Sequence, residues 1–399
     1  MHLILGAGCA GLSLACALLD EGVGEQIVLV DHRTSFDHDR TWCFWSAADG
    51  PQLPFASLAT HRWPAWRLVG RDGRAVVHRS ASQPYVHIPA DRFYAAALGR
   101  LERAANVELR LGERVLGVDA RADDVQVRTA KGSLDGAIAY DAMGGAGPLN
   151  RHRATGAVEL RQRFLGLEVE VERPVFDPST ATLMDFRVSD ADASDALRFT
   201  YVLPFSPTRA LVEDTSLGGR AVGATDRRSA IAEHLETVWN AGAVHVLREE
   251  RGALAMTTHP FPTVRGPRLL AVGAAAGALR PSSGYAFVRL QRHVRVVARS
   301  VAAGVSPPAR IGAHRHERLD RLFLRALAAD PATFDRHLLA LARGIDGATF
   351  ARFMTDASSV RDEAAVISAL ARPGFLRAIT RGAQSAQGVG AARTRVAPA

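Results

Sequence analysis

The sequence predicts an α/β fold with a discontinuous first domain, an inserted antiparallel β-sheet and a helical C-terminal region. An apolar run at residues 3–5 leads through a glycine-rich turn into an apolar helical stretch at residues 12–19. Residues 160–217 alternate apolar and polar side chains with a period of two, which is typical of strands. A last buried strand at residues 269–272 returns to the first domain, so two separated segments build that domain.

The glycine-rich turn has the spacing of a dinucleotide-binding fingerprint. Gly6, Gly8 and Gly11 form G-x-G-x-x-G between strand and helix, and a second apolar strand at residues 27–30 ends at Asp31. Gly6 allows the tight turn, Gly8 lets backbone N–H groups approach a pyrophosphate, and Gly11 lets helix and strand pack closely. The helix N-terminus presents its positive end to the phosphates, and Asp31 can accept hydrogen bonds from an adenosine ribose. The sequence therefore predicts a Rossmann-like domain; the alternative is a glycine-rich turn without a ligand.

The other elements follow in chain order from periodicity and turn signals. We expect a helix at residues 90–98 with an Asp cap near its start, and a glycine-rich exit from the first domain at residues 144–148. Strands are expected at residues 107–111, 114–118, 125–128, 138–141, 164–171 and 182–186, with a hairpin around 206–208. Helices are expected at residues 226–240 and 285–303, then between 315 and 380 with breaks at Pro331, Gly344 and Pro373.

These elements group into four parts. The Rossmann-like domain takes residues 1–150 and 260–305, the antiparallel substrate domain residues 151–259, and the helical region residues 306–380. Residues 381–399, rich in Gly, Ala, Gln and Arg, are expected to form a disordered tail. A nucleotide domain that is interrupted by an antiparallel sheet and recovered late is the plan of hydroxylase-like flavoproteins. Nicotinamide dehydrogenases usually complete that domain in one pass.

The composition excludes several kinds of site. The 3 cysteines show no C-x-x-C spacing, which disfavours a disulfide framework or a structural zinc, and no histidine pair has a recognised ligand spacing, so we expect no metal. The net charge is +8, but the arginines that carry it are spread along the chain instead of forming a basic stripe. We therefore expect no nucleic-acid partner, and an anionic membrane surface is the better partner.

Targeting signals are also absent from the sequence pattern. Residues 3–19 are uncharged, but no basic segment precedes them and the first Arg is Arg33, so they are not interpreted as a signal peptide. A spanning helix needs roughly 20 apolar residues, and no segment comes closer to that length than residues 3–19. We expect a cytoplasmic protein that is peripherally associated with the cytoplasmic membrane.

Four motifs beyond the glycine-rich turn carry a family resemblance. They are RTWCFW (residues 40–45), YVLPFSPTR (201–209) followed by LVEDT (211–215), REERG (248–252) and PSSGY (281–285). In this order they resemble the bacterial lycopene beta-cyclase family. Residues 323–327, 353–354 and 373–377 resemble that family's helical end, so the resemblance covers nearly the whole chain, and the 201–215 hairpin is its most specific part.

This resemblance implies a flavoenzyme without net redox chemistry. Members of the family resemble FAD monooxygenases in fold, require reduced FAD, for which NAD(P)H is the expected reductant, and isomerise lycopene and related C40 carotenoids. A proton adds to the terminal double bond, the C5=C6 bond attacks the C1 cation, and loss of the C6 proton leaves a β-ring. The expected product is β-carotene, formed through γ-carotene. Such a site needs an acid in a dry apolar cavity, a group that stabilises a carbocation, and a base.

Glu213 is the candidate acid and base. It shares one strand face with Thr215, whereas Asp214 lies on the other face. A carboxyl against an apolar cavity has its charged form disfavoured, so its pKa rises and it can hold a proton at neutral pH. Asp214 is either a supporting catalytic partner or an outward neighbour, and in the alternative interpretation both residues end a strand at the surface. Glu249 and Glu250 resemble the family's second acidic site, of which we select Glu250, although either fits an exposed charge.

The resemblance also implies the residues around the flavin. Pro281, Ser283, Gly284 and Tyr285 are expected to open the late helix, whose N–H groups and dipole favour negative charge at the pyrimidine end of a reduced flavin. A negative flavin beside an apolar cavity can stabilise a carbocation, which explains a need for reduction without net electron transfer. The alternative is an ordinary proline-led helix start. The other expected cofactor-binding residues are Thr41, Trp42, Gly273 and Gly277.

Some positions have a second interpretation or depart from the flavoprotein pattern. Trp42, Phe44 and Trp45 either offer aromatic faces to the polyene or fill the core. Flavin hydroxylases usually carry an Asp that binds the ribityl chain where this chain has Ala274, and often an Arg where it has Met143. Both departures weaken a hydroxylase interpretation.

Two other functions remain open from the sequence. A redox flavoenzyme on the same fold, such as a monooxygenase or an isoprenoid reductase, would consume NAD(P)H in proportion to substrate. A non-catalytic carotenoid- or flavin-binding protein would return a polyene unchanged. The sequence leaves the oligomeric state open, and also whether one or both ends of lycopene are cyclised and whether the ring is β or ε.

Overall fold

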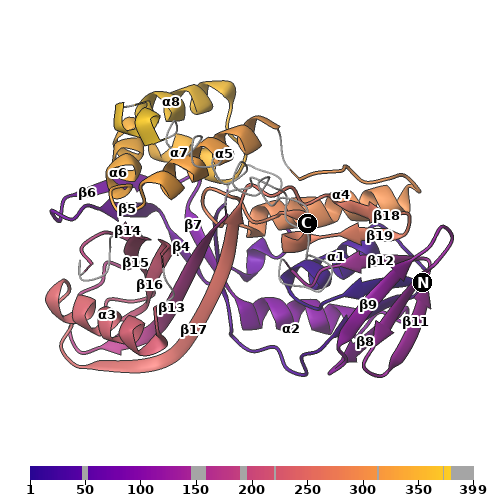
Figure 1. Ribbon diagram of the computed structural model, residues 1–399. Helices are drawn as coiled ribbons and strands as arrows, with labels where there is room; N and C mark the ends of the chain where they lie inside the picture. The colour runs from indigo at the N-terminus through magenta and orange to yellow at the C-terminus, as the bar shows by residue number, and fades with distance from the viewer. Residues whose placement is uncertain are drawn as a thin grey trace, which may run out of the picture.

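The computed structural model describes residues 1–46, 53–144, 159–188, 196–219, 222–311, 314–371 and 373–378. Over these residues the chain forms two sheet-based units that lie side by side, and C-terminal helices pack above one of them (Figure 1). One unit holds the N-terminus and the glycine-rich turn. The other is a long, curved sheet that is largely antiparallel.

The first unit is built on a sheet whose central strands are apolar runs. Leu3 is aligned in parallel with Val28 on one side and with Ala139 on the other. All three side chains are buried, as expected for parallel strands that are covered on both faces. In spatial order the strands are β18 (Val264–Gly266), β19 (Leu269–Ala271), β12 (Ile138–Asp141), β1 (His2–Leu5), β2 (Ile27–Asp31) and β8 (Val107–Leu111). The late strand β19 lies parallel to β12, which confirms the predicted return of the chain.

Helices cover one face of this sheet, and a small sheet covers the other. α1 (Cys9–Asp20) packs against α2 (Ala90–Leu101) and α4 (Phe287–Ala302). On the opposite face, Leu3 and Val30 pack with the small sheet, formed by β9 (Val115–Ala120), β10 (Val125–Thr129) and β11 (Gly132–Gly136). The late helix begins two residues after its predicted start, because residues 281–286 form a loop before it.

The second unit is a seven-stranded sheet that draws on more of the chain than predicted. In spatial order it contains β17 (Val244–Thr257), β13 (Glu159–Val171), β16 (Arg209–Gly218), β15 (Ala196–Pro204), β14 (Thr180–Asp185), β5 (Ala65–Val69) and β6 (Ala75–Arg79). The predicted hairpin at 206–208 joins β15 and β16. However, β5 and β6 belong to this sheet, although residues 1–150 were all predicted to lie in the first domain. The periodicity of a short strand does not indicate which sheet it joins.

Two further features complete this unit. β17 was not predicted, because the adjacent apolar residues Val246 and Leu247 interrupt the alternation of apolar and polar side chains. Both are more than 40% exposed in the structure. α3 (Ala224–Thr237) packs on β13 and β16. A small sheet of β3 (Thr41–Trp45), β7 (Tyr85–Pro89) and β4 (His61–Trp63) contributes to the cores of both units.

The C-terminal helices share a hydrophobic core with the large sheet and with β4. This core includes Trp63, Trp66, Leu324 and Phe334. The helices are α5 (His314–Ala329), α6 (Asp335–Gly344), α7 (Gly347–Met354) and α8 (Val360–Leu370), so the predicted breaks near Pro331 and Gly344 are confirmed. Among the described residues, no helix combines the length and apolar character needed to cross a bilayer. The predicted tail, residues 381–399, lies outside the described residues.

Candidate active site

A mostly apolar cavity of about 700 Å³ joins the two units and extends under the C-terminal helices. It reaches Gly8 beside the glycine-rich turn at one end and Ile367 of α8 at the other. Between these ends it is lined by strands of the large sheet and by residues 282–286. Glu213 and Thr215 both line it, which agrees with their predicted common face.

Glu213 and Glu250 meet at this cavity. They lie on β16 and β17, in register with Gly166 of the strand between them. Both side chains are buried, and they share a hydrogen bond. Burial, together with the nearby charge of Glu250, raises the pKa of Glu213 well above its usual range. The raised pKa favours the protonated form of Glu213.

Two neighbouring side chains donate hydrogen bonds to Glu250. Thr41 Oγ1 donates a hydrogen bond to Glu250 Oε2 at 2.8 Å, and Arg248 Nη1 donates to the same oxygen at 2.5 Å. Arg248 also donates to Glu168 Oε2 at 3.1 Å and to the backbone carbonyl of His38 at 3.1 Å. Sequence reasoning did not select Arg248. Its place in the REERG motif, two residues before Glu250 and so on the same strand face, is a signal that indicates it.

The neighbouring acids point away from the cavity. Asp214 accepts hydrogen bonds from Arg227 Nη1 at 2.5 Å and from Arg198 Nη2 at 3.2 Å, on the opposite face of β16. Glu249 pairs with Arg228 at 2.7 Å. Because side chains alternate along a strand, only Glu250 of its pair faces inward. The structure thus places Asp214 in an ion pair that joins α3 to β16, on the face opposite Glu213, and its catalytic role stays a prediction.

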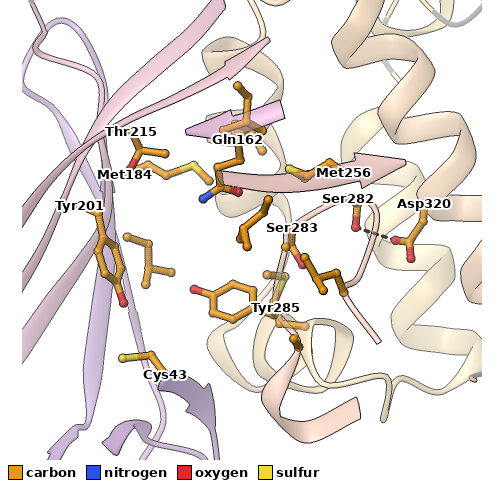
Figure 2. Close-up of a pocket in the computed structure, with 18 of the residues that line it drawn as sticks. Cys43, Gln162, Met184, Tyr201, Thr215, Met256, Ser282, Ser283, Tyr285 and Asp320 are labelled. Atoms are coloured by element: carbon orange, nitrogen blue, oxygen red, sulfur yellow. Dashed lines mark hydrogen bonds between the residues drawn. The ribbon is translucent and has the colours of Figure 1, made fainter. Parts of the chain in front are cut away.

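Three tyrosines line the cavity near Glu213: Tyr85 is buried, and Tyr201 and Tyr285 are partly buried. The hydroxyl of Tyr85 lies 2.9 Å from that of Tyr201 and 2.7 Å from that of Tyr285. Figure 2 shows the hydroxyls of Tyr201 and Tyr285 pointing toward the same space, with Cys43 beside it. Burial raises the pKa of all three phenols, so they remain neutral. Tyr285 was predicted at the site, Tyr201 lies in a quoted motif, and Tyr85 has no motif signal.

The glycine-rich turn has the close packing that its spacing indicates. Gly6 has a φ of +104°, a conformation that favours glycine. A Cβ on Gly11 would lie 1.8 Å from the carbonyl oxygen of Gly6, so only glycine allows this approach of α1 to the turn. A Cβ on Gly8 would instead meet nothing nearer than Arg33 Nη2 at 3.8 Å. The cavity thus reaches the backbone at Gly8.

Asp31 lies at the end of β2, with its carboxylate bonded to the turn itself. It accepts hydrogen bonds from the backbone N–H of Ala7 at 2.7 Å and of Arg33 at 2.8 Å. Burial opposes ionisation, but the hydrogen bonds from Arg33 and Ala7 lower the pKa of Asp31, which is therefore a carboxylate. Arg33 lines the cavity and is a candidate cofactor residue that sequence reasoning missed. The ribose contact of Asp31 stays a prediction.

The other predicted cofactor residues fall into two groups. Those that line the cavity are Thr41, Trp42, Ser283, Gly284 and Tyr285. Gly273 and Gly277 flank the short 3₁₀ helix η2 (Gly273–Ala276), and a Cβ on Gly273 would lie 2.4 Å from Ala10 Cβ of α1. Gly273, Gly277 and Pro281 are not among the residues that line the cavity, and their cofactor contacts stay a prediction. Phe44 and Trp45 are buried in the core, which supports the second interpretation given for them.

The loop before α4 is anchored to the C-terminal helices. Ser282 Oγ donates to Asp320 Oδ1 at 2.6 Å (Figure 2), and the fully buried Arg280 donates to the same oxygen at 3.0 Å. This network holds residues 282–286 against the cavity.

The residues around Gly8 fit a bound FAD. The open backbone there lies at the N-terminus of α1, and the first N–H groups of a helix have no partner within the helix. Such groups bind phosphates well. A single cavity connects this point to residues 282–286 and to the carboxyl pair.

Comparisons with known proteins agree with this arrangement. The family model described as lycopene cyclase protein matches residues 2–380. The lycopene beta-cyclase of Paracoccus sp. is 30% identical over 361 residues, which cover 86% of this chain and 81% of that protein. The lycopene beta-cyclase of Pantoea ananas is 28% identical over 292 residues, which cover 71% of this chain and 70% of that protein.

Solved structures support the fold alone. The p-nitrophenol 4-monooxygenase of Pseudomonas putida DLL-E4 has a TM-score of 0.60 at 14% identity, over 94% of this chain and 97% of that one. A geranylgeranyl bacteriochlorophyll reductase-like protein of Thermoplasma acidophilum has a TM-score of 0.61 at 14% identity, over 97% and 98%. The predicted hydroxylase-like flavoprotein fold is confirmed. Since the family model spans almost the whole chain, this protein belongs to the lycopene cyclase family.

Proposed function

We propose that this protein is a lycopene beta-cyclase that isomerises lycopene and related C40 carotenoids to β-ring products without net redox change. The observation that carries the proposal is the carboxyl pair. Glu213 is buried with a raised pKa beside Glu250, which Thr41 and Arg248 hold, in a mostly apolar cavity. Such a pair supplies a proton donor and a proton acceptor in a place from which water is largely excluded.

The proposed reaction balances without an external reactant. Glu213 gives its proton to the terminal double bond, which leaves a tertiary cation at C1 and a carboxylate on Glu213. The π electrons of C5=C6 form the C1–C6 bond and move the positive charge to C5. Transfer of the C6 proton to the carboxyl pair forms the ring double bond and restores the proton. The rings of Phe164, Tyr201 and Tyr285 line the cavity and can stabilise the cation through their faces.

FAD is the cofactor in this proposal. Gly8 and Arg33 would hold its phosphates, Asp31 its ribose, and the loop around Gly284 its pyrimidine end. Bound in the reduced form, with NAD(P)H as the source of electrons, FAD supplies negative charge that stabilises the carbocation and is not consumed. Trp42 packs edge-to-face against Phe93 and so holds its indole at the cavity wall.

Expression in cells that accumulate lycopene tests the function. We expect β-carotene, with γ-carotene as the half-cyclised product, identified by chromatography and mass spectrometry; recovery of lycopene alone would contradict the proposal. With purified, flavin-loaded protein, cyclisation should proceed without stoichiometric oxidation of NAD(P)H. Stoichiometric oxidation would instead favour a monooxygenase or an isoprenoid reductase.

Membrane attachment is the second part of the proposal, and the cavity rim supports it. Leu322 of α5, Ile367 of α8 and Leu376 line the cavity and are also 39%, 50% and 51% exposed. Arg318 and Arg321 are exposed on the same helix as Leu322. An apolar opening beside cations suits a polyene that leaves an anionic bilayer. We propose peripheral attachment to the cytoplasmic leaflet through this rim.

Replacing the three rim residues should weaken membrane binding. The variant Leu322→Ser/Ile367→Ser/Leu376→Ser should float less with anionic liposomes and cyclise vesicle-borne lycopene more slowly, with its FAD content unchanged. The control Val244→Ser/Val246→Ser/Leu247→Ser removes three exposed apolar side chains of β17 and should float like the parent protein. Flotation should also rise with anionic lipid, at about 1 kcal/mol per near-surface Arg. Equal flotation of the two variants would contradict the rim assignment.

A further inference from the structure

The meeting of Glu213 and Glu250 depends on the residue between them. The two residues lie on strands that flank β13, and both are in register with Gly166. Neighbouring strands are about 4.8 Å apart, so the backbones of the two glutamates are separated by about 9–10 Å. Residues directly opposite one another in a sheet point to the same face. The two side chains therefore meet only by leaning over the position of Gly166.

Gly166 has no side chain to keep them apart. A Cβ there would lie 2.8 Å from Cγ of Glu213 and 3.2 Å from Cγ of Glu250. Even the methyl group of alanine would push at least one carboxyl away. The glycine thus makes room for the shared hydrogen bond of the pair.

Arg248 supplies a positive charge beside the carboxyl pair of Glu213 and Glu250. It binds Glu250 and its own register partner Glu168, and Glu168 also accepts from Arg209 Nε at 2.8 Å. Although burial opposes ionisation, the two guanidinium groups lower the pKa of Glu168. Two carboxylates are therefore matched by two cations. A third charge, on Glu213, would have no cation of its own in this group.

We propose that Gly166 and Arg248 are positioning residues that decide which carboxyl carries the proton. Gly166 brings the two side chains together, and Arg248 holds Glu250 as the anion, so that Glu213 is the donor. This inference rests on the proposed function, because it concerns the proton used for cyclisation. Among the described residues, the titratable and charged groups around Glu213 include Glu250, Arg248, Tyr201, Tyr285 and Cys43, with Glu168 bonded to Arg248 and Tyr85 to Tyr201.

Substitutions of Gly166 and Arg248 should move the alkaline limb of the pH–rate profile in opposite directions. Activity needs Glu213 protonated and Glu250 ionised, so the alkaline limb reports the first group and the acidic limb the second. In Gly166→Ala the separated carboxyls interact less, so the alkaline limb should move to lower pH and the rate should fall about 10- to 100-fold. In Arg248→Gln the lost cation should move both limbs to higher pH by about one unit or more. Arg248→Lys, which keeps the charge, should restore most of the profile.

The measurement is kcat/KM for lycopene in detergent micelles against pH, with flavin-loaded, reduced protein and equal FAD content. Gly117→Ala is the control, because the three atoms nearest to a Cβ there all belong to the flexible side chain of Arg128 in the small sheet. It should leave the profile unchanged. If Gly166→Ala does not fold, the comparison of Arg248→Gln with Arg248→Lys still tests the inference. Unmoved limbs in the folded variants would overturn the inference while the parent protein still forms β-carotene, whereas a parent protein that returns lycopene unchanged would overturn the proposed function itself.

Discussion

Replacing Glu213 with Gln should reduce cyclisation by about 10²–10⁴-fold, the range associated with general acid–base catalysis. Gln keeps the size and polarity of the side chain, and its amide can still donate to Glu250 across Gly166. It cannot give a proton to a carbon–carbon double bond. FAD content and melting temperature should stay near those of the parent protein, because the turn at Gly8 lies on other segments. The measurement is β-carotene formed per flavin-loaded molecule.

Asp214→Asn is the matched control one residue along the strand. It acts on the opposite face, where it leaves the buried Arg227 without its carboxylate partner. Breaking a buried pair in this way costs about 3–5 kcal/mol of stability. The melting temperature should therefore fall, while the rate per folded molecule stays close to that of the parent. Near-native cyclisation by Glu213→Gln with FAD bound would mean that the proton comes from Glu250 or from another group.

Replacing Gly8 with Val should abolish FAD binding without unfolding the protein. The backbone at Gly8 is extended, with a φ of −76°, so valine can adopt it. A Cβ there would have no protein atom nearer than Arg33 Nη2 at 3.8 Å, and Gly8 lines the cavity, so a side chain at this position should block the approach of a pyrophosphate. Flavin fluorescence after purification, together with the melting temperature, measures the two effects separately.

Gly11→Ala should give a different outcome, which serves as the contrast. Its methyl group would lie 1.8 Å from a backbone oxygen that cannot move away, so the variant should lose folded protein together with flavin. Unaltered flavin affinity in a folded Gly8→Val variant would exclude the phosphate site at this turn.

Helices and strands were predictable from the sequence where a continuous apolar run, or one apolar face, marks the element. The strand before Gly6, the helix after it and the late strand at 269–271 are continuous apolar segments in the core of the first unit. The inward face of Glu213 followed from simple alternation along its strand. The helix at residues 90–98 followed from its apolar spacing, and it extends three residues further to Leu101. The predicted Asp cap was wrong, because Pro89 is the N-cap residue and Asp91 lies within the first turn.

Other features depended on contacts that a local pattern does not encode. β5 and β6 alternate like any short strands, and only their pairing with β14 assigns them to the large sheet. The sequence of β17 has no regular alternation at its start, where apolar residues are exposed. Only its pairing with β13 identifies it as a strand. Whether Glu249 or Glu250 faces the cavity was equally undetermined, because the pattern around them was not recognised as a strand.

By itself the sequence determined the order of the elements, the glycine-rich turn, the family resemblance and Glu213 as the acidic residue of the hairpin. Only the tertiary structure decided that Glu250 is its partner, that Arg248 holds this partner, and that Asp214 belongs to a separate ion pair. The reason is physical. Periodicity reports which way a side chain points from its own strand, whereas the meeting of two carboxyls depends on which strands pair, and in what register, across a glycine more than 40 residues away from either of them.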